Sequence, residues 1–357
     1  MSEPKTYSEK RFSENIDAMR RLASGERRVL IRAHWPDRAA DMNQVLFYHD
    51  SEAEIEFYVS LYNRMVEALE AGFDNVPFFR VDFGRMAWLM SVAYGCEVIE
   101  VGKLLNSKPR FHSLEAIAEL TPPEPVHEHG FYPEIARRMR EIERRFGPVP
   151  FVPSDTQSPI DVATEVVATE PFLLGMYDSP ELVHKLLEML AVSIGDVLEH
   201  QASVVSNWIG YGHDYPLPVG VHLSDDNAAF LSPEVYEEFA APTIETLADR
   251  FGGVTLHCCM GYQQNLNVMS SVRGFLGFDP QPGYNDRELI LSAIRDRGFW
   301  RIFSVPEDSD PLTVYKEAID QTHDRAGLML DVHGADRDSA LRLATQVREY
   351  ADEKGNS

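Results

Sequence analysis

Short apolar runs alternate with longer amphipathic segments along most of the chain, and this alternation predicts strands followed by helices. A short strand is expected at 28–33 and another at 76–82. From residue 147 onward, strands are expected at 149–153, 204–209, 219–223, 254–259, 274–278, 300–305 and 328–332. Strands that alternate with helices form parallel βαβ units. The strand at 76–82 and the seven downstream strands make eight, which favours a single α/β barrel of the (β/α)8 (TIM) type.

Two of the predicted helices begin with the same signal, a Ser-Pro-Glu run at 179–181 and again at 232–234. The serine can cap the helix, the proline suits its first turn, and the acid faces the positive end of the helix dipole. The second helix is expected to end near residues 250–253, where a glycine supplies the left-handed C-cap. Upstream helices are expected at 8–26 and 52–72, with a short capped helix at 114–120.

These elements suggest three parts of the chain. Residues 1–72 form an N-terminal, largely helical extension that packs on the barrel, residues 73–350 form the barrel, and residues 351–357 form a polar tail. An α/β barrel of this size is ordinary for one domain.

Composition narrows the classes of partner and compartment. The 357 residues carry a net charge of −24, which argues against nucleic acid because a phosphate backbone needs a basic surface. The apolar stretches are too short for a membrane span, and the polar N-terminus does not resemble a signal peptide. Three cysteines, two of them adjacent, cannot form a disulfide framework. We therefore expect a cytoplasmic protein with no nucleic-acid or membrane partner.

Reactive side chains stand where four of the predicted strands end, which is where the chemistry of α/β barrels is found. These side chains are Asp82, Asp225 with Asp226, His257 with Cys259, and His333.

His257 and Cys259 lie two residues apart and therefore point to the same face of an extended strand. An imidazole and a thiolate are ligands that zinc prefers, while Cys258 points the other way and can pack as a small apolar residue. His333, at another strand end, is the expected third metal ligand. Three protein ligands would leave the fourth position for a substrate. Buried free cysteine is common in protein cores, so a purely structural role for this pair remains open.

The acidic strand ends also allow two interpretations. Asp225 and Asp226 could form a catalytic pair, or one of them could cap the helix that follows. Asp82 could act in catalysis or form a salt bridge with Arg85. Three clusters of aromatic and polar residues could line a pocket: His34-Trp35-Pro36, His49 and His213-Asp214-Tyr215.

Several segments resemble the uroporphyrinogen decarboxylase superfamily in the same order over about residues 75–350. They are Asp-Phe-Gly-Arg at 82–85, Ala-Tyr-Gly-Cys-Glu-Val at 93–98, Glu-Pro-Phe-Leu-Leu at 170–174, the run 178–188, Ser-Asp-Asp at 224–226 and Leu-Ser-Pro-Glu at 231–234. The resemblance implies a (β/α)8 barrel.

The methyltransferase branch of that superfamily carries a zinc-binding His-x-Cys where His257 and Cys259 stand. The resemblance implies a zinc enzyme that moves a methyl group between a small molecule and a corrinoid held by a partner protein. The branch's third ligand is a cysteine near the position of His333, so this chain departs from the pattern there. Asp225 or Asp226 would orient the substrate or shuttle a proton.

Two alternatives are a metal-free decarboxylase, with Asp82, Asp225 and Asp226 as polar anchors, and a non-catalytic corrinoid- or tetrapyrrole-binding protein. The decarboxylases carry an N-terminal arginine motif that this chain lacks, although His333-Gly334 resembles their terminal His-Gly. Arg32 and Arg38 are the nearest basic residues to the missing motif.

Overall fold

Six parallel strands form the main sheet of the protein. The structure is a computed structural model, and it describes residues 3–36, 42–118, 120–281, 283–294, 298–322 and 325–355. Their order is β1-β8-β7-β6-β5-β4. The strands are β1 (Val29–His34), β4 (Val221–Ser224), β5 (Val254–Cys258), β6 (Phe275–Pro280), β7 (Phe299–Ile302) and β8 (Gly327–His333). The sheet's first strand therefore comes from the segment 1–72, and β1 pairs with β8 along its whole length.

The rest of the barrel wall is made of isolated parallel bridges rather than ladders. Phe151 bridges both Phe79 and Trp208, and further bridges join Tyr211 to Val221 and Gln157 to Ser224. The strands predicted at 76–82, 149–153 and 204–209 are therefore wrong as regular strands. Prolines 77, 150 and 153 lack the N–H that a ladder needs, and helix α8 continues to residue 204.

Side chains join β1 to the segment that precedes Phe79. The Asn75 carboxamide accepts from Ala33 N at 2.8 Å and donates to Ala33 O at 3.1 Å. Nearby, Asp74 N donates to Ile31 O at 2.9 Å, and Ile31 N donates to the Asp74 carboxylate at 2.7 Å. These bonds replace a strand ladder at this position. Together with the strands and the isolated bridges, they give the wall of an α/β barrel.

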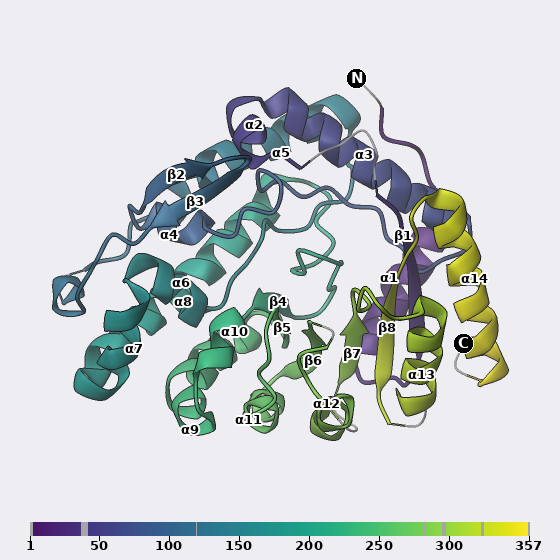
Figure 1. Ribbon diagram of the computed structural model, residues 1–357. Helices are drawn as coiled ribbons and strands as arrows, with labels where there is room; N and C mark the ends of the chain where they lie inside the picture. The colour runs from purple at the N-terminus through teal and green to yellow at the C-terminus, as the bar shows by residue number, and fades with distance from the viewer. Residues whose placement is uncertain are drawn as a thin grey trace.

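Helices cover the outside of the strands, with α10 to α14 beside β4 to β8 and α3 on the opposite side of the molecule (Figure 1). The first group of helices is α1 (Glu9–Ala23), α2 (Gln44–His49), α3 (Ser51–Glu70), α4 (Leu89–Ala93), α5 (Tyr132–Phe146), α6 (Pro159–Val166) and α7 (Thr169–Asp178). The second is α8 (Pro180–Val204), α9 (Pro233–Val235), α10 (Ala241–Phe251), α11 (Leu266–Ser271), α12 (Arg287–Ile294), α13 (Pro311–Thr322) and α14 (Arg337–Glu353). No helix in the described ranges combines the length and apolar character that crossing a membrane requires.

Helix boundaries agree with the sequence signals in some places and depart from them in others. Ser232 caps α9 by accepting from Val235 N, and Gly252 ends α10 in the left-handed conformation, both as predicted. Ser179 stands before α8 but makes no capping bond through its side chain. The short helix predicted at 114–120 is only a 3-10 turn over Glu115–Ile117.

The elements that the sequence analysis did not predict include a hairpin and a π-helical segment. The strands β2 (Glu97–Val101) and β3 (Leu104–Lys108) form an antiparallel hairpin outside the barrel sheet. Between α9 and α10 the chain forms a π-helical segment, Tyr236–Ala240. Such segments are frequent at functional sites, and this one directs the Tyr236 hydroxyl to Asp225.

Candidate metal centre and adjoining cavity

His257 and Cys259 meet at the carboxyl end of β5. The His257 Nε2 atom lies 3.0 Å from Cys259 Sγ, so the two side chains share a direction as their spacing predicts. Asp226, which follows β4, brings a carboxylate to the same place, and its Oδ1 accepts from Cys259 N at 2.5 Å. One potential ligand atom from each of the three residues lies within 4.8 Å of the others. A nitrogen, a sulfur and an oxygen donor therefore converge at this strand end.

The His257 ring is held so that Nε2 faces the other two donors. Its Nδ1 lies 2.8 Å from the backbone oxygen of Asp279 in β6, which is an acceptor and therefore requires the proton on Nδ1. Burial opposes a positive charge on His257, but the Asp279 carboxylate and Cys259 outweigh it and raise the pKa of His257 well above its usual value. The surroundings of this ring thus favour its positively charged form.

The adjacent acids Asp225 and Asp226 have different environments. Asp225 is fully buried and accepts hydrogen bonds from Ser158 Oγ at 2.7 Å and Tyr236 OH at 2.6 Å. Burial raises the pKa of Asp225 to about 6, although these two hydroxyls oppose the shift. Asp226, in contrast, is half-buried and faces Cys259. Of these two adjacent acids, only Asp226 stands beside His257 and Cys259.

Asp161 at the start of α6 holds the loop that presents Asp226. Its carboxylate accepts from the backbone N–H groups of Asp226 and Asn227, both at 2.8 Å. Sequence reasoning did not single out Asp161, because a lone acid in the first turn of a helix is an ordinary feature.

A second group of potential ligands consists of His222, His257 and Asp279. His222 Nε2 lies 3.1 Å from Asp279, but Arg301 Nη1 also bonds to that carboxylate at 2.6 Å. A guanidinium at this position already neutralises the carboxylate and disfavours a cation, so this group supports the first one rather than forming a metal site. The signal that could have revealed His222 and Asp279 is a polar residue inside an otherwise apolar strand.

His333, the third ligand expected from the sequence, is not a member of this group in the part of the chain that the structure describes. His333 ends β8, which β6 and β7 separate from β5. Its Nε2 lies 2.9 Å from Phe303 O, and its ring stacks on His34 with 5.1 Å between centroids. Asp226 instead lies beside His257 and Cys259, because β4 is the direct neighbour of β5.

Buried ion pairs fill the barrel interior below these strand ends. Asp331 accepts from Arg32 Nη2 at 2.5 Å and from Arg301 Nη2 at 2.8 Å, and Arg301 continues to Asp279. All four residues are less than 5% exposed. Burial opposes ionisation of Asp331, but the two guanidiniums hold its pKa well below the usual value. These charges make a fixed interior scaffold that extends to His222 and His257.

Asp82 is fully buried, and its oxygens are bonded within the protein. It pairs with Arg80 Nε at 2.7 Å and accepts from Tyr58 OH and from Arg85 N. The predicted salt bridge between the Asp82 and Arg85 side chains is wrong, since the Arg85 guanidinium pairs with Asp214 at 3.0 Å. Residues 83–85 all have positive φ, and Asp82 helps to hold this strained turn. Its contacts indicate that Asp82 positions Arg85.

Two of the three aromatic and polar clusters noted in the sequence line one cavity. His34 and Trp35, at the end of β1, share its wall with His213, Asp214 and side chains of α3, and its volume is about 220 Å³. The third cluster residue, His49, pairs with Glu100 at the surface instead. We call this space the α3 cavity.

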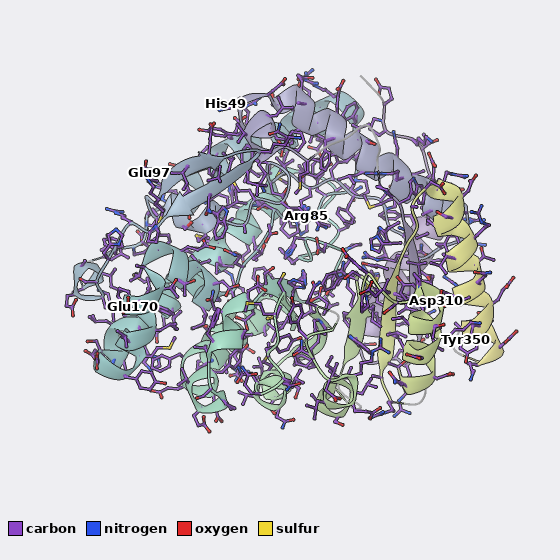
Figure 2. The ribbon with its side chains drawn as sticks, in the orientation of Figure 1. His49, Arg85, Glu97, Glu170, Asp310 and Tyr350 are labelled. Carbon is purple, nitrogen blue, oxygen red and sulfur yellow. The ribbon has the colours of Figure 1, made fainter. Side chains whose placement is uncertain are left out.

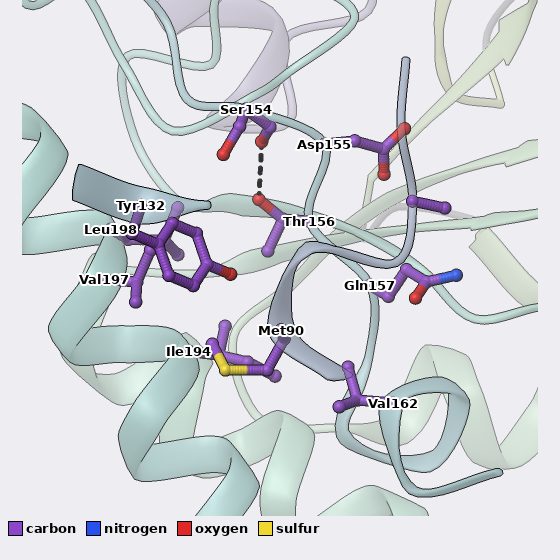
Figure 3. Close-up of a pocket in the computed structure, with 11 residues that line it drawn as sticks. Met90, Tyr132, Ser154, Asp155, Thr156, Gln157, Val162, Ile194, Val197 and Leu198 are labelled. Atoms are coloured by element: carbon purple, nitrogen blue, oxygen red, sulfur yellow. Dashed lines mark hydrogen bonds between the residues drawn. The ribbon is translucent and has the colours of Figure 1, made fainter. Parts of the chain in front are cut away.

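Another cavity, between α8 and residues 154–157, is much smaller. Its volume is about 20 Å³, and Met90, Ile194 and Leu198 make its wall largely apolar (Figure 3). That volume holds about one water molecule and cannot accept a substrate.

The half-buried imidazole of His34 predicts a specific dependence of stability on pH. Burial outweighs the attraction of Asp331 and lowers the pKa of His34 to about 4, so the folded protein keeps this ring neutral where the unfolded chain protonates it. Stability is therefore lost as the pH falls below about 6.5. Between pH 7 and 5 this effect amounts to at most about 2 kcal/mol. Urea unfolding should show that His34→Gln loses correspondingly less stability than the wild type over this interval. Equal losses would contradict the prediction.

Comparisons with known proteins agree on the fold. The family model for uroporphyrinogen decarboxylase (URO-D) matches residues 62–282, more than half of the chain. The solved structure of a methyltransferase from Methanosarcina mazei is similar, with a TM-score of 0.64 and 14% sequence identity over 96% of this chain and 98% of that one. At this identity the likeness shows a shared fold. No curated protein matches the sequence significantly.

Proposed function

This chain belongs to the uroporphyrinogen decarboxylase (URO-D) family, and from that premise we propose that it is a methyltransferase whose Asp226, His257 and Cys259 hold a zinc ion. The observation that carries the proposal is the convergence of three donor atoms within 4.8 Å at the ends of β4 and β5. The name of the structural neighbour, a methyltransferase, is consistent with it.

The donor set suits zinc, which binds imidazole nitrogen, thiolate sulfur and carboxylate oxygen. Zinc held by three protein side chains keeps a fourth position for a small thiol and lowers the pKa of that thiol, so that a nucleophilic thiolate forms near neutral pH. The chain's own residues prepare the site. Asp279 O fixes the His257 ring, and Asp161 holds the loop of Asp226. Cys258, turned into the core and fully buried, takes no part.

The methyl group would move between that small molecule and a corrinoid carried by a partner protein. The placement of Cys259 supports an encounter with another protein, because Cys259 is exposed at a strand end. Two large apolar side chains are also exposed: Met260, which follows Cys259, and Phe230, at the end of the turn that begins at Asp226. A partner could therefore approach the reactive side chains directly.

The alternative, a metal-free decarboxylase with Asp82 and the pair Asp225-Asp226 as polar anchors, has less support. Asp82 and Asp225 are fully buried and bonded to neighbouring side chains. The α3 cavity, at about 220 Å³, is below the range of about 300–1,000 Å³ usual for drug-sized ligands, and a tetrapyrrole is larger than these.

Metal content and methyl transfer together test the proposal. The purified wild type should contain close to one zinc per chain and should demethylate methylcobalamin in the presence of a small thiol. The double variant His257→Ala/Cys259→Ala should lose both properties, because only one of three ligands remains. The variant Cys96→Ala removes a buried cysteine at the end of α4 and should keep the zinc. A metal-free wild type, or a double variant with unchanged activity, would overturn the proposal.

A further inference from the structure

One wall of the α3 cavity is an apolar stripe of helix α3. Phe57, Leu61 and Met65 line the cavity at a spacing of four residues, which places them on the same face of the helix. Helix α3 packs on the core through other residues, among them Val59 and Tyr62, which are at most 1% exposed. The three residues of the stripe, in contrast, are only half-buried. The stripe therefore keeps apolar area that a ligand in the cavity would remove from water.

Two further aromatic side chains, Trp35 and Phe78, line the cavity and are also half-buried. Their rings offer faces and edges against which another ring packs favourably. The volume of the cavity, about 220 Å³, limits the size of that ring system. An apolar protein cavity of about 150 Å³ holds benzene, so the α3 cavity has room for one aromatic ring with a small substituent.

The charged side chains at the opposite wall are already paired within the protein. Arg80 pairs with Asp82 at 2.7 Å and with Asp214 at 3.1 Å. Arg85 pairs with the same Asp214 carboxylate at 3.0 Å. An ionised ligand would lose hydration in the cavity and would compete with these partners, which is unfavourable. The paired charges therefore favour an uncharged ligand.

This wall still offers hydrogen bonds to a neutral group. The Arg85 side chain is 59% exposed and only donates, whereas the Asp214 carboxylate beside it, 17% exposed, only accepts. In Figure 2 Arg85 lies in the interior of the view, whereas His49 and Glu97 lie on the outer surface. A neutral amide both donates and accepts, so it matches a wall on which a donor and an acceptor stand side by side.

We propose that the α3 cavity is a binding site for a small uncharged aromatic molecule, with its ring against the apolar stripe of α3 and a neutral hydrogen-bonding group towards Arg85 and Asp214. Burial of the ring supplies most of the affinity, and the paired charges of the opposite wall discriminate against ions. The inference goes beyond the proposed function, because binding in this cavity requires no metal at the ends of β4 and β5.

Benzamide is the probe, and benzoate and benzamidine are its anionic and cationic counterparts of nearly the same shape. A ligand-observed NMR titration of the full chain should show saturable binding of benzamide. Both ions should bind at least about tenfold more weakly, because neither finds a free counter-charge in the cavity. Acetamide, which lacks the ring, should be weaker by a similar factor. Absence of saturable benzamide binding, or equal affinity for either ion, would overturn the proposal.

Variants of α3 test whether benzamide binds in this cavity. Leu61→Trp fills the cavity and should abolish benzamide binding, whereas Leu289→Trp makes the same change on the exposed face of α12 and should leave the affinity unchanged. Leu61→Ala removes part of the apolar stripe without filling the cavity and should weaken benzamide several-fold. Circular dichroism verifies that each variant is folded. Undiminished benzamide binding in folded Leu61→Trp and Leu61→Ala variants would place the ligand elsewhere and contradict the proposal.

Discussion

Replacing Asp331 with alanine is expected to lower the free energy of unfolding by about 3–5 kcal/mol. Its carboxylate is 2% exposed and bonds to both Arg32 and Arg301 inside the barrel. Without it Arg32 loses its carboxylate partner, so its buried positive charge remains uncompensated, while Arg301 keeps Asp279 at 2.6 Å and Asp214 at 3.6 Å. Equilibrium urea unfolding measures the change.

The matched control removes an ion pair of similar bidentate geometry at the surface. Arg137 bonds to Glu134 at 2.7 Å through two nitrogens, but its side chain is 55% exposed. Arg137→Ala should cost less than about 1 kcal/mol, because water and salt screen exposed charges. If the two variants lost similar amounts of stability, the interior ion pairs could not be the scaffold that we infer.

Asp226→Ala is expected to lower zinc affinity by on the order of a hundredfold or more, since even residues behind the ligands contribute 10–100-fold. The reason is geometric: the Asp226 carboxylate is the third donor near His257 and Cys259. Competition against a chromogenic chelator measures the affinity. Acid should weaken binding as well, because the proton that Asp279 favours on His257 competes with the metal.

His333→Ala is the discriminating control, because the sequence pattern favours His333 as the third ligand and the structure favours Asp226. Its ring bonds to Phe303 O and stacks on His34, away from the metal group. Zinc affinity in this variant should stay near the wild-type value. A large loss in His333→Ala together with a small loss in Asp226→Ala would reverse the assignment.

The parts of the barrel that sequence patterns predicted well are those with continuous apolar runs. The strands β4 to β8 and the helices α1, α3 and α10 appear close to their expected positions. Residues 76–82 and 149–153 fail as strands because their prolines cannot take part in a ladder. The side chain of Asn75 instead connects β1 to the segment before Phe79, an interaction that no periodic sequence pattern predicts.

The sequence by itself determined the alternation of strands and helices and the shared direction of His257 and Cys259, because both follow from local backbone geometry. Only the tertiary structure decided which third group joins them. Neighbours in a barrel are set by strand order, so β4 delivers Asp226 to β5, whereas β6 and β7 lie between β5 and β8. Likewise, His34 and His213 lie far apart in the sequence, and only the fold brings both of them to the wall of the α3 cavity.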